Sequence, residues 1–299
     1  MALLSPETVP VKMYKWDDVG APELKKTAAN GAAEIFKACL VVGYGAKPSA
    51  GWTMPFEASG VKVFRPQIGA ETDFYLRMAS DNGRQVDARI YQNMTNANTG
   101  NLKLNCAQRF KYTQGFSSGK WLLVASPRSV WFFCEQGFFL DTSDLLSKSG
   151  AFFFAGDTMR NSIGVRAVFL QHTGGSYNDG DYRDIFGYNR YGEVDKIPES
   201  YIAGKLLDST GVVYNAELES FFDGHTARTQ DRILSPLLTF AGNNAYQIPG
   251  LTVVSNGATR DNFTTQNIDM GDYVSDIMTF STNPSLATNF CVATDKWSY

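Results

Sequence analysis

Apolar residues recur at intervals of three or four positions in one stretch near the start of the chain. The members of this stripe are Leu24, Ala28, Ala32, Ile35, Phe36, Cys39 and Leu40. Such spacing places side chains on one face of a helix. Asp17 or Asp18 is a candidate N-terminal cap, Pro22 suits a first helical turn, and Gly43 and Gly45 end the pattern. We therefore expect one amphipathic helix with its apolar face toward the core.

Beyond Pro55 the pattern changes to alternation of apolar and mostly polar residues, which is typical of strands with one buried face. Residues 74–90 alternate around the turn signal Ser80-Asp81-Asn82-Gly83, which predicts an antiparallel hairpin. A second hairpin is expected over residues 120–134, around Ser126-Pro127-Arg128. Shorter strands are expected near residues 138–139, 152–154, 165–170, 211–222, 236–241, 251–255, 273–281 and 287–295. Residues 274–280 fit a helix equally well.

These elements predict a mainly β (α+β) fold of antiparallel sheets or a sandwich, with one N-terminal amphipathic helix and long loops. We expect an extended N-terminal arm over residues 1–20, and a helix with a β core over residues 21–172. Residues 173–200 are rich in Gly and Tyr and predict a long loop or insertion. Residues 201–299 supply further strands that complete the same domain or a second small one.

Two aromatic runs, Trp131-Phe132-Phe133 and Phe152-Phe153-Phe154, bear on assembly. Alternate residues of a strand point to opposite faces, so such runs need both faces covered. A second sheet, a helix or another subunit would each provide that cover. Among the physical features of the sequence, this one gives the best hint of assembly.

The composition narrows the range of functions. The chain has 299 residues, of which 43% are hydrophobic and 19% charged, so it is globular and can bury a sizeable core. The formal net charge of −3 gives no basic face, and we expect no nucleic-acid partner. No apolar run is long enough to span a bilayer and no signal peptide is recognisable, so we expect synthesis in a cytoplasm and no membrane anchoring.

Catalytic signatures are not apparent in the sequence. It has two histidines, His172 and His225, and neither lies in a nucleophile or zinc-binding motif. The four cysteines, Cys39, Cys106, Cys134 and Cys291, stand singly and are expected to be buried reduced thiols. We therefore assign no catalytic residue and no cofactor, and we expect that the protein is not an enzyme.

The Gly- and Tyr-rich stretch contains the remaining candidate sites. Asp179 and Asp181 are weak candidates for calcium ligands, but a turn-forming cluster explains them as well. The same pair would serve a cell-wall glycan hydrolase, which needs two carboxylates. Four tyrosines of this stretch are candidates for a contact surface toward other subunits or toward a host surface glycan. They are Tyr177, Tyr182, Tyr188 and Tyr191.

Several segments of the chain resemble a known family. The block Trp16-Asp17-Asp18 with Gly20-Ala21-Pro22, followed by Val42-Gly43-Tyr44-Gly45, Lys47-Pro48, Gly51-Trp52-Thr53 and Pro55-Phe56, resembles a family of tailed-bacteriophage and prophage virion proteins. Further similar segments are Phe64-Arg65, Phe74 to Arg77, Ser126 to Phe133, Phe153 to Asp157 and Ile248 to Leu251. The similarity covers about residues 15–160 and is scattered beyond them. It implies a structural part of the virion, in the tail, neck or baseplate, and it carries over no catalytic residues.

The resemblance leads to a working hypothesis. The protein acts in the virion by self-assembly, and its partners are other copies of itself and other virion proteins. Trp16 and Asp17, with the four tyrosines, are the interface candidates. The arm and the Gly- and Tyr-rich loop would order against neighbouring subunits, so deleting residues 1–14 would leave the domain folded yet abolish its incorporation into particles. The alternatives are a capsid decoration protein, a receptor- or glycan-binding module, and a cell-wall glycan hydrolase.

Overall fold

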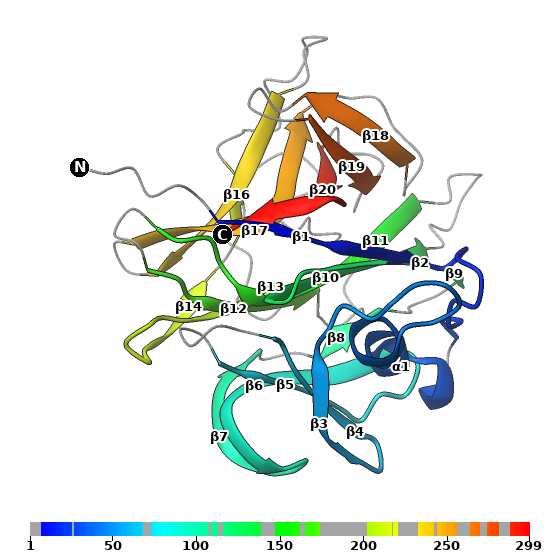
Figure 1. Cartoon of the computed structure of the whole chain (residues 1–299), viewed down its shortest axis with the longest axis vertical. Coiled ribbons are helices and arrows are strands. Elements are labelled where there is room, and N and C mark those ends of the chain that lie inside the picture. The colour runs from blue at the N-terminus through cyan, green and yellow to red at the C-terminus, as the bar shows by residue number, and fades with distance from the viewer. Residues whose placement is uncertain are drawn as a thin grey trace.

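Three layers of antiparallel sheet make up the computed structural model. It describes residues 7–25, 27–67, 73–106, 109–112, 116–138, 147–161, 165–173, 202–216, 218–220, 233–241, 244–255, 264–269, 274–280 and 288–299. A central sheet lies in the middle, with a second sheet on one face and a helix with a third sheet on the other (Figure 1). The fold is thus mainly β with antiparallel pairing, as the sequence predicts.

The central sheet has seven strands in the order β14-β13-β12-β11-β10-β9-β2. The bounds are β2 Lys12–Lys15, β9 Phe116–Ala125, β10 Ser129–Phe138, β11 Ser147–Asp157, β12 Val168–Thr173, β13 Ile202–Leu207 and β14 Val213–Ala216. Strands β9 to β14 follow one another along the chain as a meander, whereas β2 joins from the N-terminal segment. The expected hairpin around residues 126–128 is confirmed, because β9 and β10 pair antiparallel on either side of it.

Two six-stranded sheets flank this centre. The second sheet consists of β15 Leu218–Ser220, β16 Ile233–Ala241, β17 Asn244–Ser255, β18 Thr264–Asp269, β19 Val274–Phe280 and β20 Thr288–Ala293. The third consists of β3 Thr53–Ala58, β4 Val61–Arg65, β5 Tyr75–Ala79, β6 Gln85–Asn96, β7 Thr99–Asn105 and β8 Phe110–Lys111. The expected hairpin of residues 74–90 is confirmed as β5 paired with β6. Residues 274–280 form a strand.

The N-terminal arm is part of the fold rather than a projecting segment. Strand β1 (Thr8–Pro10) pairs with β21 (Lys296–Ser298), and β2 pairs with β9 at the edge of the central sheet. Tyr14 within β2 is buried. The backbone of the described part of the arm thus pairs with this same chain, and the expectation that residues 1–14 can be removed without loss of the fold stays a prediction to be tested.

The helix begins later than the sequence predicts, and two strands precede it. A 3₁₀ turn, η1 (Ala28–Asn30), is followed by α1 (Ala32–Phe36) and a π-helical segment, η2 (Lys37–Val42). Gly31 has an extended backbone and separates η1 from α1. The segment around Pro22 is not helical. The carbonyl oxygen of Pro22 accepts a hydrogen bond from Trp121 Nε1 at 3.0 Å, which ties this segment to the central sheet instead.

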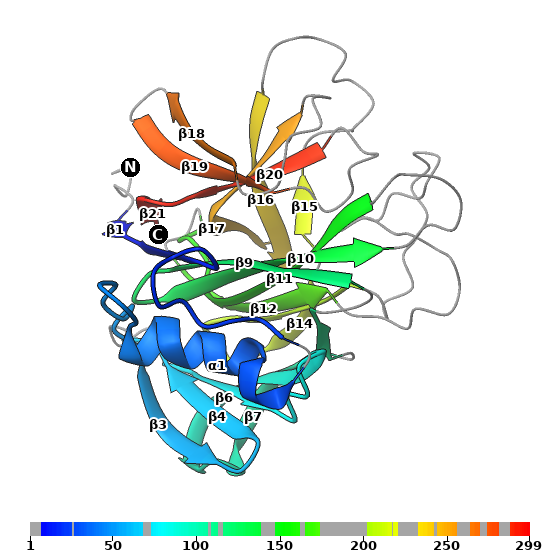
Figure 2. The ribbon, with the colours of Figure 1, turned by 90° about the vertical axis from the view of Figure 1, so that its right-hand side faces the viewer.

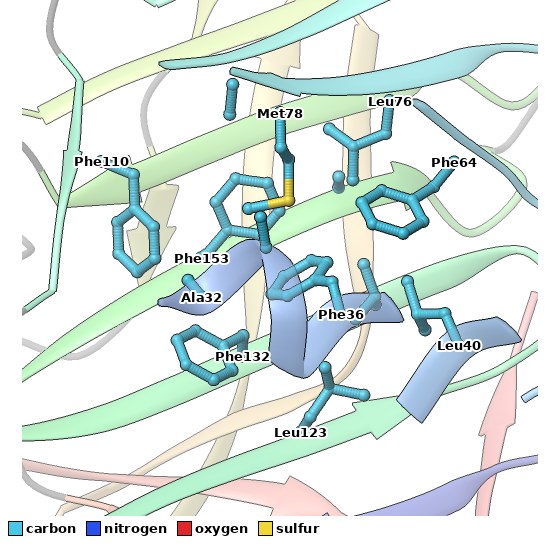
Figure 3. Close-up of a cluster of buried hydrophobic side chains, with 14 of the residues drawn as sticks. Ala32, Phe36, Leu40, Phe64, Leu76, Met78, Phe110, Leu123, Phe132 and Phe153 are labelled. Carbon is cyan, nitrogen blue, oxygen red and sulfur yellow. The ribbon is translucent and has the colours of Figure 1, made fainter. Parts of the chain in front are cut away.

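Both faces of the central sheet are covered within the chain. Phe132 and Phe153 pack with the helix and the third sheet, where each ring centroid lies 5.4 Å from that of Phe36 (Figure 3). On the opposite face, Trp131 and Phe154 pack with residues of β17, β20 and β21. Figure 2 shows α1 between the central and third sheets. The aromatic runs therefore need no neighbouring subunit to cover them.

Candidate functional site

The sites proposed from the sequence divide into two groups. Trp16 and Asp17 are described, whereas Tyr177, Tyr182, Tyr188, Tyr191, Asp179 and Asp181 lie outside the described residues. His225 also lies outside them. The backbone of His172 pairs with Phe153 and Ala203 in the middle of the central sheet.

Trp16 lies where the N-terminal arm leaves the central sheet. Its half-buried side chain packs against both hydrophobic clusters. The ammonium groups of Lys15 and Lys120 lie 6.0 Å and 5.6 Å from its ring centroid, within the range of cation–π attraction. Asp17 is exposed and forms an ion pair with Lys15 at 3.1 Å. Trp16 thus has a packing role, and Asp17 remains on the surface.

Asp18 is the centre of a cluster that the sequence patterns did not reveal, and we call it the arm clasp. Its Oδ2 atom accepts hydrogen bonds from Lys15 N and from Tyr44 Oη, each at 2.8 Å, and lies 2.8 Å from Lys47 Nζ. Burial alone raises the pKa of this carboxyl. The hydrogen bonds from these three groups outweigh burial and hold the pKa below its ordinary value. One carboxylate therefore joins the arm to the segment after the helix.

The arm clasp also closes the edge of the central sheet. Lys47 Nζ donates to the carbonyl of Met13 at 2.9 Å, and Tyr14 Oη donates to the carbonyl of Pro48 at 2.8 Å. Gly45 has φ +52°, and a Cβ there would lie 2.2 Å from the carbonyl oxygen of Val19. Only glycine allows the two loops to approach this closely. Asp18, Tyr44 and Lys47 thereby fasten β2 to the segment after the helix.

A second polar cluster, which we call the terminal cluster, joins the described ends of the chain. Arg166 Nη2 lies 2.8 Å from the Glu7 carboxylate, and Arg128 Nη2 lies 3.3 Å from it. Arg128 Nη1 also lies 3.5 Å from the buried carboxylate of Asp157. Burial raises the pKa of Glu7, but the two arginines outweigh that effect and lower it. Alternating charges therefore connect the start of β1 with the central sheet.

Tyr299 completes the terminal cluster. Its backbone exchanges two hydrogen bonds with Glu7, of 2.8 Å and 3.1 Å. Its hydroxyl lies 2.5 Å from Ser126 Oγ, which accepts the backbone N–H groups of Arg128 and Ser129. Since those two bonds occupy the lone pairs of Ser126, its own proton is available to Tyr299. Burial raises the pKa of the Tyr299 hydroxyl, which stays neutral and acts as an anchor.

The third sheet and the helix border a pocket of about 230 Å³. Three ionisable residues line it: Glu34, Lys62 and Asp81. Lys62 Nζ lies 2.6 Å from Glu34 Oε1, and the Asp81 carboxylate accepts the N–H groups of Ala33 and Gly83 and the hydroxyl of Tyr112. Asp81 thus holds the start of α1 against the β5–β6 turn, and the Glu34–Lys62 ion pair joins α1 to β4. The three charged groups that line the pocket already have partners within the chain, so we regard it as a packing gap.

The three cysteine side chains that the structure describes are poor nucleophiles, and the side chain of Cys291 lies outside the described ones. Cys39, Cys106 and Cys134 are buried. Burial raises the pKa of each thiol, to about 12 for Cys106. A thiol must ionise before it attacks an electrophile or binds a metal. Across the described residues there is also no group of three or more His, Cys, Asp or Glu side chains placed to hold a metal ion.

No family model, no curated protein and no solved structure gives a significant match. Among the described residues, no helix is long and apolar enough to cross a membrane.

The two polar clusters were missed for a physical reason. Glu7 lies 121 residues from Arg128 and 159 residues from Arg166 along the chain. No local spacing signals such pairs. Asp18 did attract attention as a helix cap, because its position before an apolar stripe has that pattern. In the fold it accepts from the arm and from the loop after the helix instead.

Proposed function

We propose that this chain is a structural component of a bacteriophage particle, located in the tail, neck or baseplate, and that it acts through contacts with other subunits. The observation that carries the proposal is the block from Trp16 to Phe56, which resembles virion proteins. The contacts of Asp18, Tyr44 and Lys47 give this block a physical purpose, because they fasten elements together.

The way the chain is closed supports the same role. The first described residue, Glu7, and the last residue, Tyr299, exchange backbone hydrogen bonds. The side chains of both reach the turn at Ser126 and Arg128. A strand that is fixed at both ends by pairing and by ion pairs resists being pulled away from the sheet. Such closure suits a protein that neighbouring subunits load mechanically.

The chemistry of the clusters supports a mechanical role over a catalytic one. The carboxylates of Asp18 and Glu7 have lowered pKa values and are engaged by cations. A general acid or base works best with a pKa near the working pH. Carboxylates held in the ionised form by lysine or arginine serve as anchors.

Deletion and complementation in a bacterium that produces the particles would test the proposal. Without the gene, we expect electron microscopy to show particles that lack a tail, neck or baseplate part. Expression of the wild-type chain in trans should restore them. The Asp179→Asn/Asp181→Asn double variant should restore them equally, since the proposal gives these carboxylates no catalytic task.

Three results would contradict the proposal. Normal, infectious particles without the gene would exclude a required structural role. Failure of the double variant alone, with the protein still incorporated, would favour the glycan hydrolase. Gold-labelled antibodies that decorate only the head would favour the capsid decoration protein.

A further inference from the structure

Charge is distributed unevenly along this chain. Residues 82–134 contain seven lysines and arginines and one acidic residue, Asp87, whereas the whole chain has 27 basic and 30 acidic residues. This segment supplies β6, β7, β8, β9 and part of β10. The expectation of no nucleic-acid partner came from the net charge of the whole chain, and such a value averages over a local surplus of this kind.

Three basic side chains of this segment differ from most others in the described part of the chain, because they have no ion pair. Arg84, Lys103 and Arg109 form neither an ion pair nor a side-chain hydrogen bond with another described residue. Arg84 and Arg109 are exposed, and Lys103 is half-buried. By contrast, ion pairs engage nine other basic residues: Lys15, Lys25, Lys37, Lys47, Lys62, Arg65, Arg89, Arg128 and Arg166.

Lys103 lies on the outer face of the third sheet, which points away from α1. Its neighbour Leu104 is buried in the core on the inner face, and it pairs with Ile90 of β6. Successive residues of a strand point to opposite faces, so Lys103 points outward. Asn105 shares this outer face and lies directly opposite Arg89.

Arg109 and Arg84 flank the short pairing between β8 and β6. Phe110 is buried in the inner core and pairs with Val86, so Arg109, which directly precedes it, lies toward the outer face. Arg84 comes directly before β6, and its carbonyl oxygen accepts the N–H of Tyr112, directly after β8. The unpaired cations thus gather on the side of the sheet where β6 pairs with β7 and β8.

Two further arginines add positive charge to this face. Arg77 of β5 and Arg89 of β6 lie directly opposite each other, and like charges in that arrangement repel. Asp87 pairs with Arg89 at 2.8 Å, whereas the guanidinium of Arg77 donates only to neutral acceptors, in residues 97 and 98. Asp87 is the one acidic residue within β5, β6, β7 and β8, so it balances only part of the positive charge.

We call the outer surface formed by Arg84, Arg89, Lys103 and Arg109 the basic face. It belongs to the third sheet, at the end of the molecule away from the second sheet (Figure 1). From Arg84 to Arg89 the extended backbone spans about 17 Å. A surface of that length fits several phosphate groups in succession better than it fits a single ion.

The residue types of the basic face favour the backbone of duplex DNA as its ligand. The planar guanidinium of arginine matches two phosphate oxygens, and neutral amides such as those of Gln85 and Asn105 also bind phosphates. Single-stranded nucleic acids are bound largely by stacking of their bases on exposed aromatic rings. The rings of Tyr91 in β6 and Phe110 in β8 are buried and provide no such platform.

We propose that the basic face binds the phosphate backbone of double-stranded DNA without reading its sequence. Charge complementarity carries the inference, because unpaired cations gather on the basic face and a duplex presents one negative charge per about 1.7 Å of its axis. The inference goes beyond the proposed function and does not depend on it, since it rests on the charges of the third sheet.

Fluorescence anisotropy with a short labelled duplex of mixed sequence tests this contact in the purified full-length chain. Arg84→Gln/Arg109→Gln removes two exposed charges of the basic face, and Arg84→Lys/Arg109→Lys keeps them. Lys25→Gln/Lys37→Gln is the matched control, because it removes two charges from surface ion pairs outside the basic face. Circular dichroism and thermal unfolding would establish that all three variants are folded.

Titrations at several salt concentrations provide the readout. We expect the wild type to bind the duplex at low salt and to lose affinity steadily as the salt concentration rises. The double glutamine variant of the basic face should bind at least about tenfold more weakly at low salt, and the slope of log affinity against log salt should be shallower by about two. The double lysine variant and the control should both retain a slope close to that of the wild type.

Other outcomes would overturn the inference. A wild type that does not bind the duplex even at low salt would exclude the contact. An equal loss in the control would mean that the net charge, rather than the basic face, governs binding. Tighter binding of a single strand of the same length would contradict the choice of a duplex. Tighter binding of polyglutamate would indicate an acidic protein as the partner instead. None of these results would bear on the virion role.

Discussion

At the scale of residues, Asp18 shows how one side chain can hold several elements. Its carboxylate receives a backbone N–H from the arm, and a phenol and an ammonium from the loop after the helix. Each bond is short, and the side chain is 11% exposed, so water competes poorly for it. Neighbouring Asp17 carries the same charge, but its side chain is exposed where it pairs with Lys15. Asp18 is more buried than Asp17 and has more hydrogen-bond donors around it, so we expect Asp18 to contribute more to the free energy of unfolding.

This difference predicts the effect of one substitution. Asp18→Asn keeps the shape of the side chain but removes the charge that Lys47 faces, so we expect a loss of about 1–3 kcal/mol in the free energy of unfolding. Asp17→Asn is the control and should change it by less than about 0.5 kcal/mol, because exposed ion pairs contribute little. Urea denaturation of both variants would measure this. Equal effects would contradict the role given to Asp18.

The lowered pKa values predict acid sensitivity. Asp18 and Glu7 have folded pKa values below the 3.8 and 4.5 expected for these carboxyls without such partners. Their stabilising contribution is complete above those values and is lost as the pH falls through the lower folded values. The free energy of unfolding should therefore decrease below pH 4.5. Denaturation at a series of pH values should show a shallower decrease for Asp18→Asn, and a curve parallel to the wild type would contradict this origin.

At the scale of elements, the sequence predicted what local chemistry decides. Apolar and polar residues alternate along the β5–β6 hairpin around an Asn-Gly turn signal, and the β9–β10 hairpin flanks Ser126-Pro127-Arg128. Both hairpins could therefore be predicted from the sequence. The helix ended as predicted before Gly43 but began late, because Gly31 adopts an extended backbone there. The pairing of β1 with β21 joins the two ends of the chain. No local pattern specifies a partner that distant, so it was missed.

The close contact between β10 and β11 predicts a strong effect at Gly156. This residue has φ +146°, and a Cβ there would lie 2.4 Å from Ser129 Cα. Gly156→Ala should therefore lower the free energy of unfolding by about 3 kcal/mol or more. Gly60→Ala is the control: it has φ +70° with no atom within 4 Å of the added Cβ, and should cost about 1 kcal/mol. A similar decrease in the free energy of unfolding for both variants would show that β11 does not approach Ser129 closely at Gly156.

The pairing of the arm predicts the result of removing it. Deleting residues 1–15 takes away β1, β2 and the buried ring of Tyr14. We expect a markedly lower melting temperature, in contrast to the sequence-based hypothesis of a dispensable arm. A synthetic peptide of residues 7–15 should raise it again, because it restores the strands that pair with β21 and β9. An unchanged melting temperature would mean that the arm contributes little to the fold.

At the scale of the whole molecule, two polar clusters fix the N-terminal segment, and a few valines remain exposed. The terminal cluster and the arm clasp fasten the N-terminal strands to the rest of the same chain. The exposed valines lie elsewhere, with Val19 in the loop after β2, Val42 at the end of η2, and Val212 and Val213 at the β13–β14 turn. The sequence predicted neither location, because exposure and strand order depend on contacts between distant segments. Of its interface candidates, Trp16 is half-buried against both hydrophobic clusters, Asp17 is exposed, and the four tyrosines lie outside the described residues.

The number of copies of this chain in each purified phage particle tests the central claim most directly. Quantitative mass spectrometry of intact particles, calibrated with labelled peptides from the chain, would give that number. We predict several copies per particle, in constant ratio to the other tail, neck or baseplate proteins. Particles that contain those proteins in full amount but lack this chain would contradict the proposed role.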